Sequence, residues 1–568
     1  MNYQLQLLNT IAGVGCFAAM PTGSLSLNDM LAHQHARPMD EFMRRQLVQK
    51  LGEMPHRKVE RMVRECVAEG GRKDPVLAAL LYEACHTHMR LTGLRPLLAP
   101  LDPAELAAHS PGVLLRSLAL PDQAAHRAAT AALRPCVLDL APVPARADLP
   151  EPPPGVAEAN PAPGPAAAEV RARLARAGLL PPPAPRRPAL ETIRRAGARL
   201  EAAEAFASGE AMHRASLSPT ALLRHWSVDV TVRHGRHANT LFGLQTCYGR
   251  GLDLLAARAS CLMECAERFS SYAAVDANGV RHRAAPMPLE PGSFADLAGR
   301  GALDPAALRL EVPYLGQTLH WVRAEAATAC DGPGAGRPRP ALVPAQLAFL
   351  FLNLDEPELF SALGSTGLAS GNTLAEARVS GLCEVLERDA AAVTPFDPAR
   401  CFRLTADDFA LAALLGGYEQ AGVQVWFQDC TTEFGVPCYK SIVLGPDGDV
   451  NQGMGCGLDG RRAVLSALTE TAWPFPGPAS GPAPADLPVR RLEDLPDACT
   501  GSAEGDGLVL DQTLLAHGYT PYTVDLTRAD LEIPVVRMVV PGLEIVADFD
   551  RYSRLSPRLW ANVARLAG

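Results

Sequence analysis

The sequence has no apolar run approaching the roughly 20 residues that a membrane-spanning helix needs, which excludes a transmembrane protein. No Lys or Arg precedes the mildly apolar stretch from Leu5 to Met20, so this stretch lacks the basic start of a secretory signal. The 14 cysteines form no C-x-x-C pair, which argues against a disulfide framework and favours reduced, mostly buried thiols. No repeat of fixed period is present, which excludes a solenoid.

Positive charge is also scarce. Lys and Arg number 53 against 62 Asp and Glu, and a formal net charge of −9 argues against nucleic acid or a membrane surface as a partner. Hydrophobic residues make up 48% and charged residues 20%, as in ordinary soluble globular proteins. We therefore expect a cytoplasmic protein, and its 568 residues suffice for two or three structural units.

The first segment, residues 1–137, is predicted to be a separate, mostly helical domain. Residues 39–67 are rich in helix formers, and residues 75–91 carry apolar side chains at helical spacing. A further helix is expected over residues 102–118, opened by Asp102 as cap and Pro103 in the first turn.

Proline marks the second segment, residues 138–188, as a linker. It contains the triplets 152–154 and 181–183, separated by Ala-rich and Glu-containing sequence. This composition is typical of a stiff, extended chain that forms no core, interrupted by one short helix near residues 168–177.

The third segment, residues 189–568, mixes strand and helix signals and predicts an α/β (mixed α+β) domain with helices packed on a mixed or antiparallel sheet. Two helices are expected near residues 253–272 and 373–392. Strands are expected at residues 228–232, 423–427 and 535–540.

Both of these helices carry an acidic stripe. Residues three or four apart share a helix face. One stripe of the first helix therefore holds Ser260, Glu264, Glu267 and Arg268, beside a core-type face with Leu262, Met263, Ala266 and Phe269. The corresponding stripe of the second helix holds Asn372, Glu376, Ser380, Glu384, Glu387 and Arg388, opposite Leu374, Leu382, Val385 and Leu386.

If the two stripes face each other, they concentrate four carboxylates, those of Glu264, Glu267, Glu384 and Glu387. Like charges at close range raise carboxyl pKa values and require cations. Mg²⁺ suits such a site because it takes carboxylate oxygens and completes its coordination with water and phosphates. The adjacent arginines would then contact phosphate oxygens.

Structural interpretations compete with this one. Glu-x-x-Glu-Arg on an isolated helix is most often a solvated face with local ion pairs. Thr373-x-x-Glu376 fits a capping box, and Asn372 fits a helix-entry residue. The neighbouring thiols of Cys261, Cys265 and Cys383 fit buried structural residues better than nucleophiles.

Several ordered motifs together resemble the YcaO family of ATP-dependent enzymes that modify peptide-backbone amides. The resemblance extends from about residue 191 to about residue 546. It rests on Ser260-x-x-x-Glu264-x-x-Glu267-Arg268, on residues 367–377, on Gly381 through Ala390, on Gly249-Arg250-Gly251, and on the late regions 525–537 and 540–543.

The resemblance implies that ATP and Mg²⁺ bind on acidic helices rather than on a P-loop, and no Gly-x-x-x-x-Gly-Lys-[Ser/Thr] motif occurs in the sequence. Relatives add a nucleophile to an amide carbonyl and use ATP to phosphorylate the resulting oxygen, giving azolines, thioamides or amidines. Matching positions make Glu264, Glu267, Glu384 and Glu387 the expected Mg²⁺ ligands. The expected ATP contacts are Arg250, Ser260, Arg268, Asn372, Glu376 and Arg388. No catalytic side chain is assigned.

The sequence departs from the family pattern at three places. Arg250 stands where relatives commonly have Lys, and it keeps the charge without the geometry. Glu470 keeps the acid of a late motif, but Trp473-Pro474 replaces that motif's polar end. The chain ends without the Pro-rich tail common in azoline-forming relatives, which puts cyclodehydration in doubt and favours thioamidation or another outcome.

These observations predict maturation of a ribosomally made precursor peptide, or of a protein substrate, by a homodimeric enzyme with a TfuA-like partner. Residues 1–137 would recognise the peptide or a partner, or support oligomerisation. Two alternatives stay open. One is a non-catalytic YcaO-like scaffold that binds a peptide or a partner enzyme, and the other is an accessory factor in ribosomal protein modification.

Overall fold

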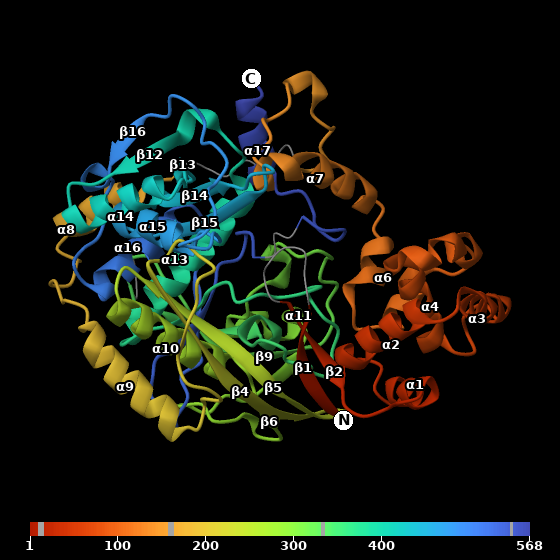
Figure 1. Ribbon diagram of the computed structural model, residues 1–568. Helices are drawn as coiled ribbons and strands as arrows, with labels where there is room; N and C mark the ends of the chain where they lie inside the picture. The colour runs from red at the N-terminus through yellow and green to blue at the C-terminus, as the bar shows by residue number, and fades with distance from the viewer. Residues whose placement is uncertain (9–15, 157–163, 331–335, 546–548) are drawn as a thin grey trace.

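The computed structural model describes residues 1–8, 16–156, 164–330, 336–545 and 549–568. Three β-sheets, with helices packed on them, make up the part that contains the two acidic helices, and a group of helices projects to one side (Figure 1). Antiparallel pairs predominate among the strands, and a few pairs are parallel. This architecture confirms the predicted mixed class. No helix in the described ranges has the length and apolar character to cross a membrane.

The first sheet is built on a long hairpin. Its two strands, β4 (Thr220–His234) and β5 (His237–Gly251), pair in antiparallel register along their whole length. Burial alternates along β4, as expected when one sheet face is covered. The sheet order is β2-β1-β5-β4-β6-β7, with β3 beside β4. The remaining strands are β1 (Asn2–Leu8), β2 (Cys16–Pro21), β3 (Ala211–Met212), β6 (Val275–Asp276) and β7 (Gly279–Val280).

The second and third sheets lie on either side of the second acidic helix. The second has the order β10-β9-β17-β18-β11 with β8 beside β9, and the third has the order β15-β14-β13-β12-β16. Strands of the second sheet are β8 (Glu290–Gly292), β9 (Leu319–Ala326), β10 (Arg339–Pro344), β11 (Leu368–Ser370), β17 (Tyr522–Asp525) and β18 (Val535–Val539). Strands of the third are β12 (Cys401–Thr405), β13 (Trp426–Asp429), β14 (Cys438–Leu444), β15 (Val450–Cys456) and β16 (Val489–Arg491).

Helices after the linker cover these sheets. They are α9 (Ala189–Ala202), α10 (Leu254–Ser271), α11 (Phe294–Leu297), α12 (Ala345–Ala348), α13 (Leu374–Val393), α14 (Phe409–Gln420), α15 (Gly460–Glu470), α16 (Ala503–Ala516) and α17 (Pro557–Leu566). The acidic helices α10 and α13 match their predicted ranges to within two residues.

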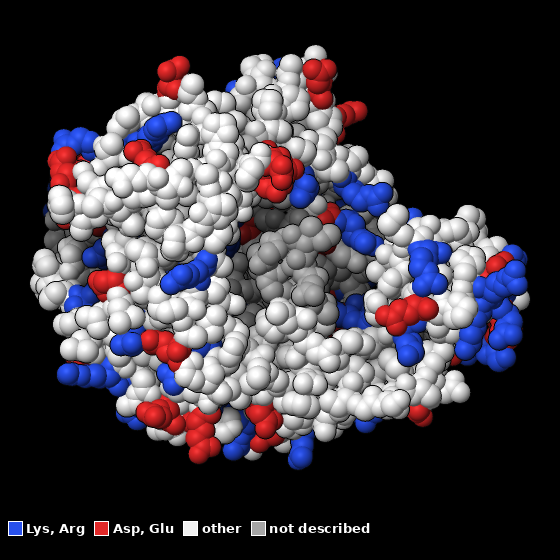
Figure 2. Space-filling model, viewed as in Figure 1, with Lys and Arg blue, Asp and Glu red and all other residues white. Residues whose placement is uncertain are grey.

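The N-terminal region is mostly helical. Its helices are α1 (Leu27–Ala36), α2 (Glu41–Glu53), α3 (His56–Ala68), α4 (Pro75–Thr87), α5 (Pro103–Leu106), α6 (Val113–Leu118) and α7 (Gln123–Leu138), with a 3-10 helix at Met89–Leu98. Lys and Arg side chains gather on the outer end of this region in Figure 2. There, α3 exposes Arg57, Lys58, Arg61 and Arg64.

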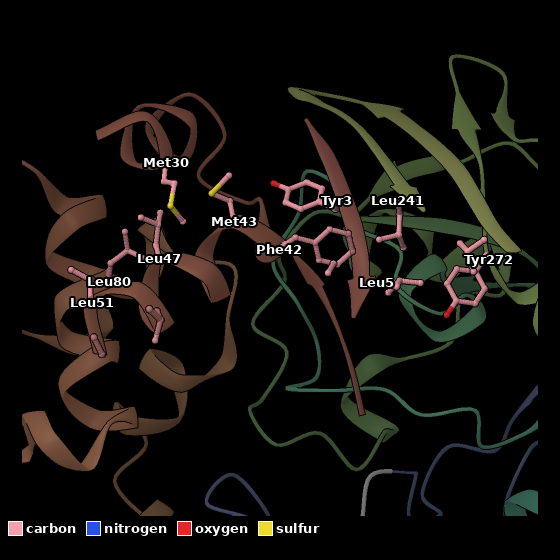
Figure 3. Close-up of a cluster of buried hydrophobic side chains, with 14 of the residues drawn as sticks. Tyr3, Leu5, Met30, Phe42, Met43, Leu47, Leu51, Leu80, Leu241 and Tyr272 are labelled. Carbon is pink, nitrogen blue, oxygen red and sulfur yellow. The ribbon is translucent and has the colours of Figure 1, made fainter. Parts of the chain in front are cut away.

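The sequence indicates no strands in this region, yet β1 and β2 join the first sheet. β1 pairs in parallel with β5 through Asn2–Gln4 and Thr240–Phe242. Figure 3 shows Tyr3 and Leu5 of β1 between helical residues such as Phe42 and Leu47 on one side and Leu241 on the other. The Tyr3 and Phe42 rings pack edge to face. One apolar cluster thus connects the N-terminal helices with the sheet that carries α10.

Three other expectations differ from the structure. Residues 102–118 form α5, a 3-10 turn and α6 instead of one helix, because Pro111 and Gly112 interrupt it. The strand expected from residue 423 begins only at Trp426.

The short helix predicted in the linker exists as α8 (Ala167–Arg176), but it packs in one buried cluster with α13, so this part of the linker does contribute to a core. Residues 157–163 of the linker lie outside the described residues, and the boundaries at 137 and 188 stay a prediction.

The junction between β1 and α2 depends on a buried hydrogen bond. The Tyr3 hydroxyl donates to Asp40 Oδ2 over 2.7 Å, and both residues are at most 1% exposed. We expect Tyr3→Phe to cost about 1–3 kcal/mol and to lower the thermal unfolding midpoint, because Asp40 loses a donor that water cannot replace. Tyr248→Phe, at a position 36% exposed on β5, is the control and should change stability by less than about 0.5 kcal/mol. Equal effects of the two variants would contradict this account.

Candidate active site

Helix α10 lies unusually close to strand β5. Asp253 caps its start by accepting from the Ala256 N–H. A Cβ at Gly249 would lie 2.1 Å from the Ala257 carbonyl oxygen, so only glycine allows this approach. The Gly-Arg-Gly motif therefore has a packing role that brings Arg250 to the edge of the helix.

Helix α13 is seated in the same way on β11 and β18. A Cβ at Gly381 would lie 2.7 Å from the Met538 side chain and 2.9 Å from the Gly367 carbonyl oxygen. The side of the helix away from the acidic stripe, with Leu382, Val385 and Leu386, is buried as predicted, whereas Leu374 is 39% exposed. Strand β11 contacts both α10 and α13, so the two acidic stripes meet around it.

The four predicted metal carboxylates are close enough for their charges to interact, and each lies beside an arginine of its own helix. We call Glu264, Glu267, Glu384 and Glu387 with these arginines the acidic cluster. Arg268 lies 3.7 Å from Glu264 and 3.4 Å from Glu267, and Arg388 lies 3.9 Å from Glu384 and 3.7 Å from Glu387. Backbone donors fix two of the carboxylates. Glu264 accepts from the Tyr248 N–H and Glu384 from the Gly367 N–H, both over 3.1 Å. Backbone N–H groups of β5 and of the residue before β11 thus aim one acid of each helix.

These carboxylates resist ionisation. The pKa of Glu267 is raised to about 8, chiefly by burial and also by Glu384 and Glu264, although Arg268 lowers it. Burial likewise raises the pKa of Glu387 to about 8, with added repulsion from Glu470 and Glu384. The pKa values of Glu264 and Glu384 are also raised, mainly by burial. Repulsion between acids of α10 and α13 shows that the two stripes face each other.

Two further charged residues beside the acidic cluster were not among the predicted ligands. Glu470, at the end of α15, lies 3.5 Å from Arg250 and raises the pKa values of Glu264 and Glu387. Arg537 of β18 is 3% exposed, and burial lowers its pKa to about 10 although Glu384 and Glu267 raise it. The sequence contained a signal for both, since Glu470 and Arg537 lie in late motifs of the family resemblance.

The remaining predicted contacts are more dispersed. Ser260 lies one turn before Glu264 on the exposed side of α10. Glu376 accepts from the Asn372 backbone N–H at 2.9 Å and from Asn372 Nδ2 at 3.1 Å, while Thr373 caps the helix. The predicted Thr373 cap is therefore present, but the Glu376 carboxylate binds Asn372 and not the Thr373 N–H. The nucleotide contacts of Asn372 and Glu376 stay a prediction. Eight residues separate Glu376 from Glu384, about 12 Å along the helix.

The donor set fits Mg²⁺ held together with phosphate groups. Among the described residues, no three His, Cys, Asp or Glu side chains converge as a metal cage. Mg²⁺ is typically bound by one or two carboxylates, and it completes its octahedron with water and phosphate oxygens. Paired carboxylates that are costly to ionise alone, flanked by Arg268, Arg388 and Arg537, provide such a setting.

Comparison with known proteins agrees with this geometry. The YcaO family profile, described as an ATP- and Mg²⁺-binding YcaO cyclodehydratase, matches residues 248–477 and 476–544, just over half of the chain. The chain belongs to the YcaO family. ATP and Mg²⁺ are this family's cofactors, which confirms the cofactor prediction.

Two relatives are similar to this chain in sequence. A Methanothermobacter thermautotrophicus protein, described as uncharacterized, is 30% identical over 346 residues, which cover 54% of this chain and 84% of the relative. A Rhizobium leguminosarum bv. trifolii protein from the tfuA 3′ region is 28% identical over 220 residues, which cover 32% of this chain and 52% of the relative.

Solved YcaO and heterocyclase structures are more distant. A heterocyclase in complex with substrate and cofactor has 18% identity and a TM-score of 0.48, covering 62% of this chain and 52% of its own. The heterocyclase TruD has 21% identity and a TM-score of 0.40, covering 53% and 47%. YcaO from Methanopyrus kandleri bound with AMPPCP and Mg²⁺ has 22% identity and a TM-score of 0.44, covering 65% and 95%. The chain thus spans about half the length of the two heterocyclases.

The raised carboxyl pKa values predict opposite pH effects on stability and on binding. Glu267 and Glu387 ionise near pH 4.5 when unfolded but near pH 8 when folded, so the unliganded protein should lose stability as pH rises from about 5 to 8. Mg²⁺ requires the ionised form, so stabilisation by Mg²⁺ and AMPPCP should increase over the same range. Thermal unfolding from pH 6 to 8.5, with and without these ligands, measures both slopes.

The double variant Glu267→Gln/Glu387→Gln provides the control, because it cannot ionise at these positions and should flatten both slopes. A wild-type protein that Mg²⁺ and AMPPCP stabilise equally at pH 6 and pH 8.5 would contradict the assigned pKa shifts.

Proposed function

We propose that the chain uses ATP and Mg²⁺ to activate a backbone amide of a peptide or protein by O-phosphorylation. The observation that carries this proposal is the facing of two acidic helices, whose carboxylates raise one another's pKa and lie beside Arg268, Arg388 and Arg537. ATP bound with Mg²⁺ supplies the phosphoryl group that turns an amide oxygen into a leaving group.

The residues of the site would have two roles, which are to balance charge and to align the reactants. Ionised Glu264, Glu267, Glu384 and Glu387 would hold Mg²⁺, and the arginines would neutralise phosphate oxygens. Asn372 and Glu376 would contact the nucleotide farther along α13, with Ser260 on α10. Holding the reactants in line is the main contribution a protein makes to phosphoryl transfer.

Thioamide formation is the outcome we favour, with azoline formation as the alternative. A relative whose gene lies in a tfuA 3′ region supports a TfuA-like partner and hence sulfide as nucleophile. The substrate would be a ribosomally made precursor peptide, and a short gene of that kind beside this one would support the assignment.

Residues 1–137 would recognise that peptide or a partner. Helix α3 supports this role because its exposed face carries four basic residues and its sequence only two acidic ones, Glu60 and Glu65. Such a face suits an acidic peptide segment, and the apolar cluster around β1 would link it to the sheet beneath α10.

The proposal is tested by calorimetry with AMPPCP and Mg²⁺. Glu264→Gln and Glu387→Gln should each weaken binding at least about tenfold, since each removes a charge needed to hold the metal. Glu60→Gln on exposed α3 is the control and should bind like wild type. A folded wild type that binds no AMPPCP, or Gln variants that bind it normally, would contradict the site.

Mass spectrometry distinguishes thioamide from azoline formation. The sample is a precursor peptide encoded beside this gene, after incubation with the protein, ATP, Mg²⁺ and sulfide. Replacement of oxygen by sulfur indicates a thioamide, and loss of water indicates an azoline.

A further inference from the structure

A second charged group, distinct from the acidic cluster, includes Asp389, the residue directly after Arg388. The Asp389 side chain is fully buried and the Arg558 side chain is 4% exposed. Arg558 Nη1 lies 2.5 Å from each carboxylate oxygen of Asp389. This ion pair joins helix α13, which carries two of the predicted metal ligands, to helix α17, 169 residues later in the sequence.

Other segments of the chain meet at the same pair. Arg558 Nε donates to Glu433 Oε1 over 2.8 Å, and the Glu544 N–H donates to Asp389 Oδ1 over 3.0 Å. Burial would lower the pKa of Arg558, but Asp389 and Glu433 raise it, so this guanidinium stays charged. Around the pair, α7, α13 and α17 share one apolar cluster.

A buried charge of this kind constrains the helix that carries it. A carboxylate without a cation is costly in the interior, and Asp389 follows Glu384 and Glu387 on a helix that already concentrates acids. Consecutive helical residues differ in direction by about 100°. Fixing the direction in which the Asp389 side chain leaves the helix therefore also fixes the directions of Glu387 and Arg388, which belong to the acidic cluster.

We infer that Asp389 and Arg558 are positioning residues of the nucleotide site, and that α17 holds the last turns of α13 in the orientation that presents Glu387 and Arg388. The inference rests on the proposed function, since it concerns the same ATP and Mg²⁺ site. Neither residue is among the predicted Mg²⁺ ligands or ATP contacts, whereas Glu387 and Arg388, which directly precede Asp389, are.

A matched control lies four residues earlier, before α17 begins. Arg554 anchors the same C-terminal segment to the start of a different helix, because its Nη2 donates to Asp122, the residue before α7, over 2.6 Å. The Leu555 N–H also donates to His126 of α7. Loss of Arg554 thus loosens the segment that leads into α17 without removing the cation beside Asp389.

The test combines hydrogen exchange with calorimetry on the full-length protein. Arg558→Gln should speed exchange of amides in residues 384–393 and weaken binding of AMPPCP with Mg²⁺ at least tenfold, whereas Arg554→Gln should change neither by more than twofold. Arg558→Lys keeps the cation but not the two-oxygen contact, and it should restore most of the affinity. If Arg558→Gln does not fold, the double variant Asp389→Asn/Arg558→Gln takes its place, because it leaves no unpaired charge in the interior, and the same loss of affinity is expected.

The outcomes separate this inference from the proposed function. Wild-type binding with unchanged affinity in Arg558→Gln, or equal losses in Arg558→Gln and Arg554→Gln, overturns the positioning role alone. A folded wild type that binds no AMPPCP overturns the proposed function and this inference together. Selective loss in Arg558→Gln, with rescue by Arg558→Lys, supports both.

Discussion

Repulsion between the largely buried carboxylates of the acidic cluster is the constraint on which this site depends. Glu267 and Glu387 come from different helices, yet each is surrounded by other acids and has a pKa of about 8. Such a cluster is stable only when protons, arginines or metal ions compensate its charge. The arginines on the same helices compensate in part, and Mg²⁺ with phosphates would complete the balance.

Two glycines, which have no side chain, allow the acidic helices to pack close to their sheets and so bring the acids near one another. Gly249 lets α10 lie against β5, and Gly381 lets α13 lie against β11 and β18. The first sheet in turn includes β1, so residues at the start of the chain share a core with the helix that carries Glu264. At the other end, α17 and α7 support α13 (Figure 1). Segments distant in sequence therefore determine the geometry of the site.

Periodicity and motif spacing predicted the two acidic helices and the stripe on each of them, because both depend on local sequence. That the stripes face each other depends on tertiary packing and entered the sequence analysis only as a condition. The parallel pairing of β1 with β5 could not be predicted, since it depends on contacts between residues more than 200 positions apart. Arg537 lies in a late motif of the family resemblance, but its place near Glu267 and Glu384 depends on the tertiary structure, so the sequence did not assign it to the site. Local signals also misplaced the start of β13 and the break at Pro111, where chain geometry overrides composition.

The central claim is that a divalent cation binds between α10 and α13 together with nucleotide phosphates. A crystal structure with AMPPCP and Mn²⁺ in place of Mg²⁺ tests it directly, because the anomalous signal of Mn²⁺ locates the metal independently of the surrounding density. The account predicts anomalous peaks within coordination distance of at least one carboxylate of each helix, from Glu264 or Glu267 and from Glu384 or Glu387. A structure in which Mn²⁺ and nucleotide bind elsewhere, with no metal at the acidic cluster, would contradict it.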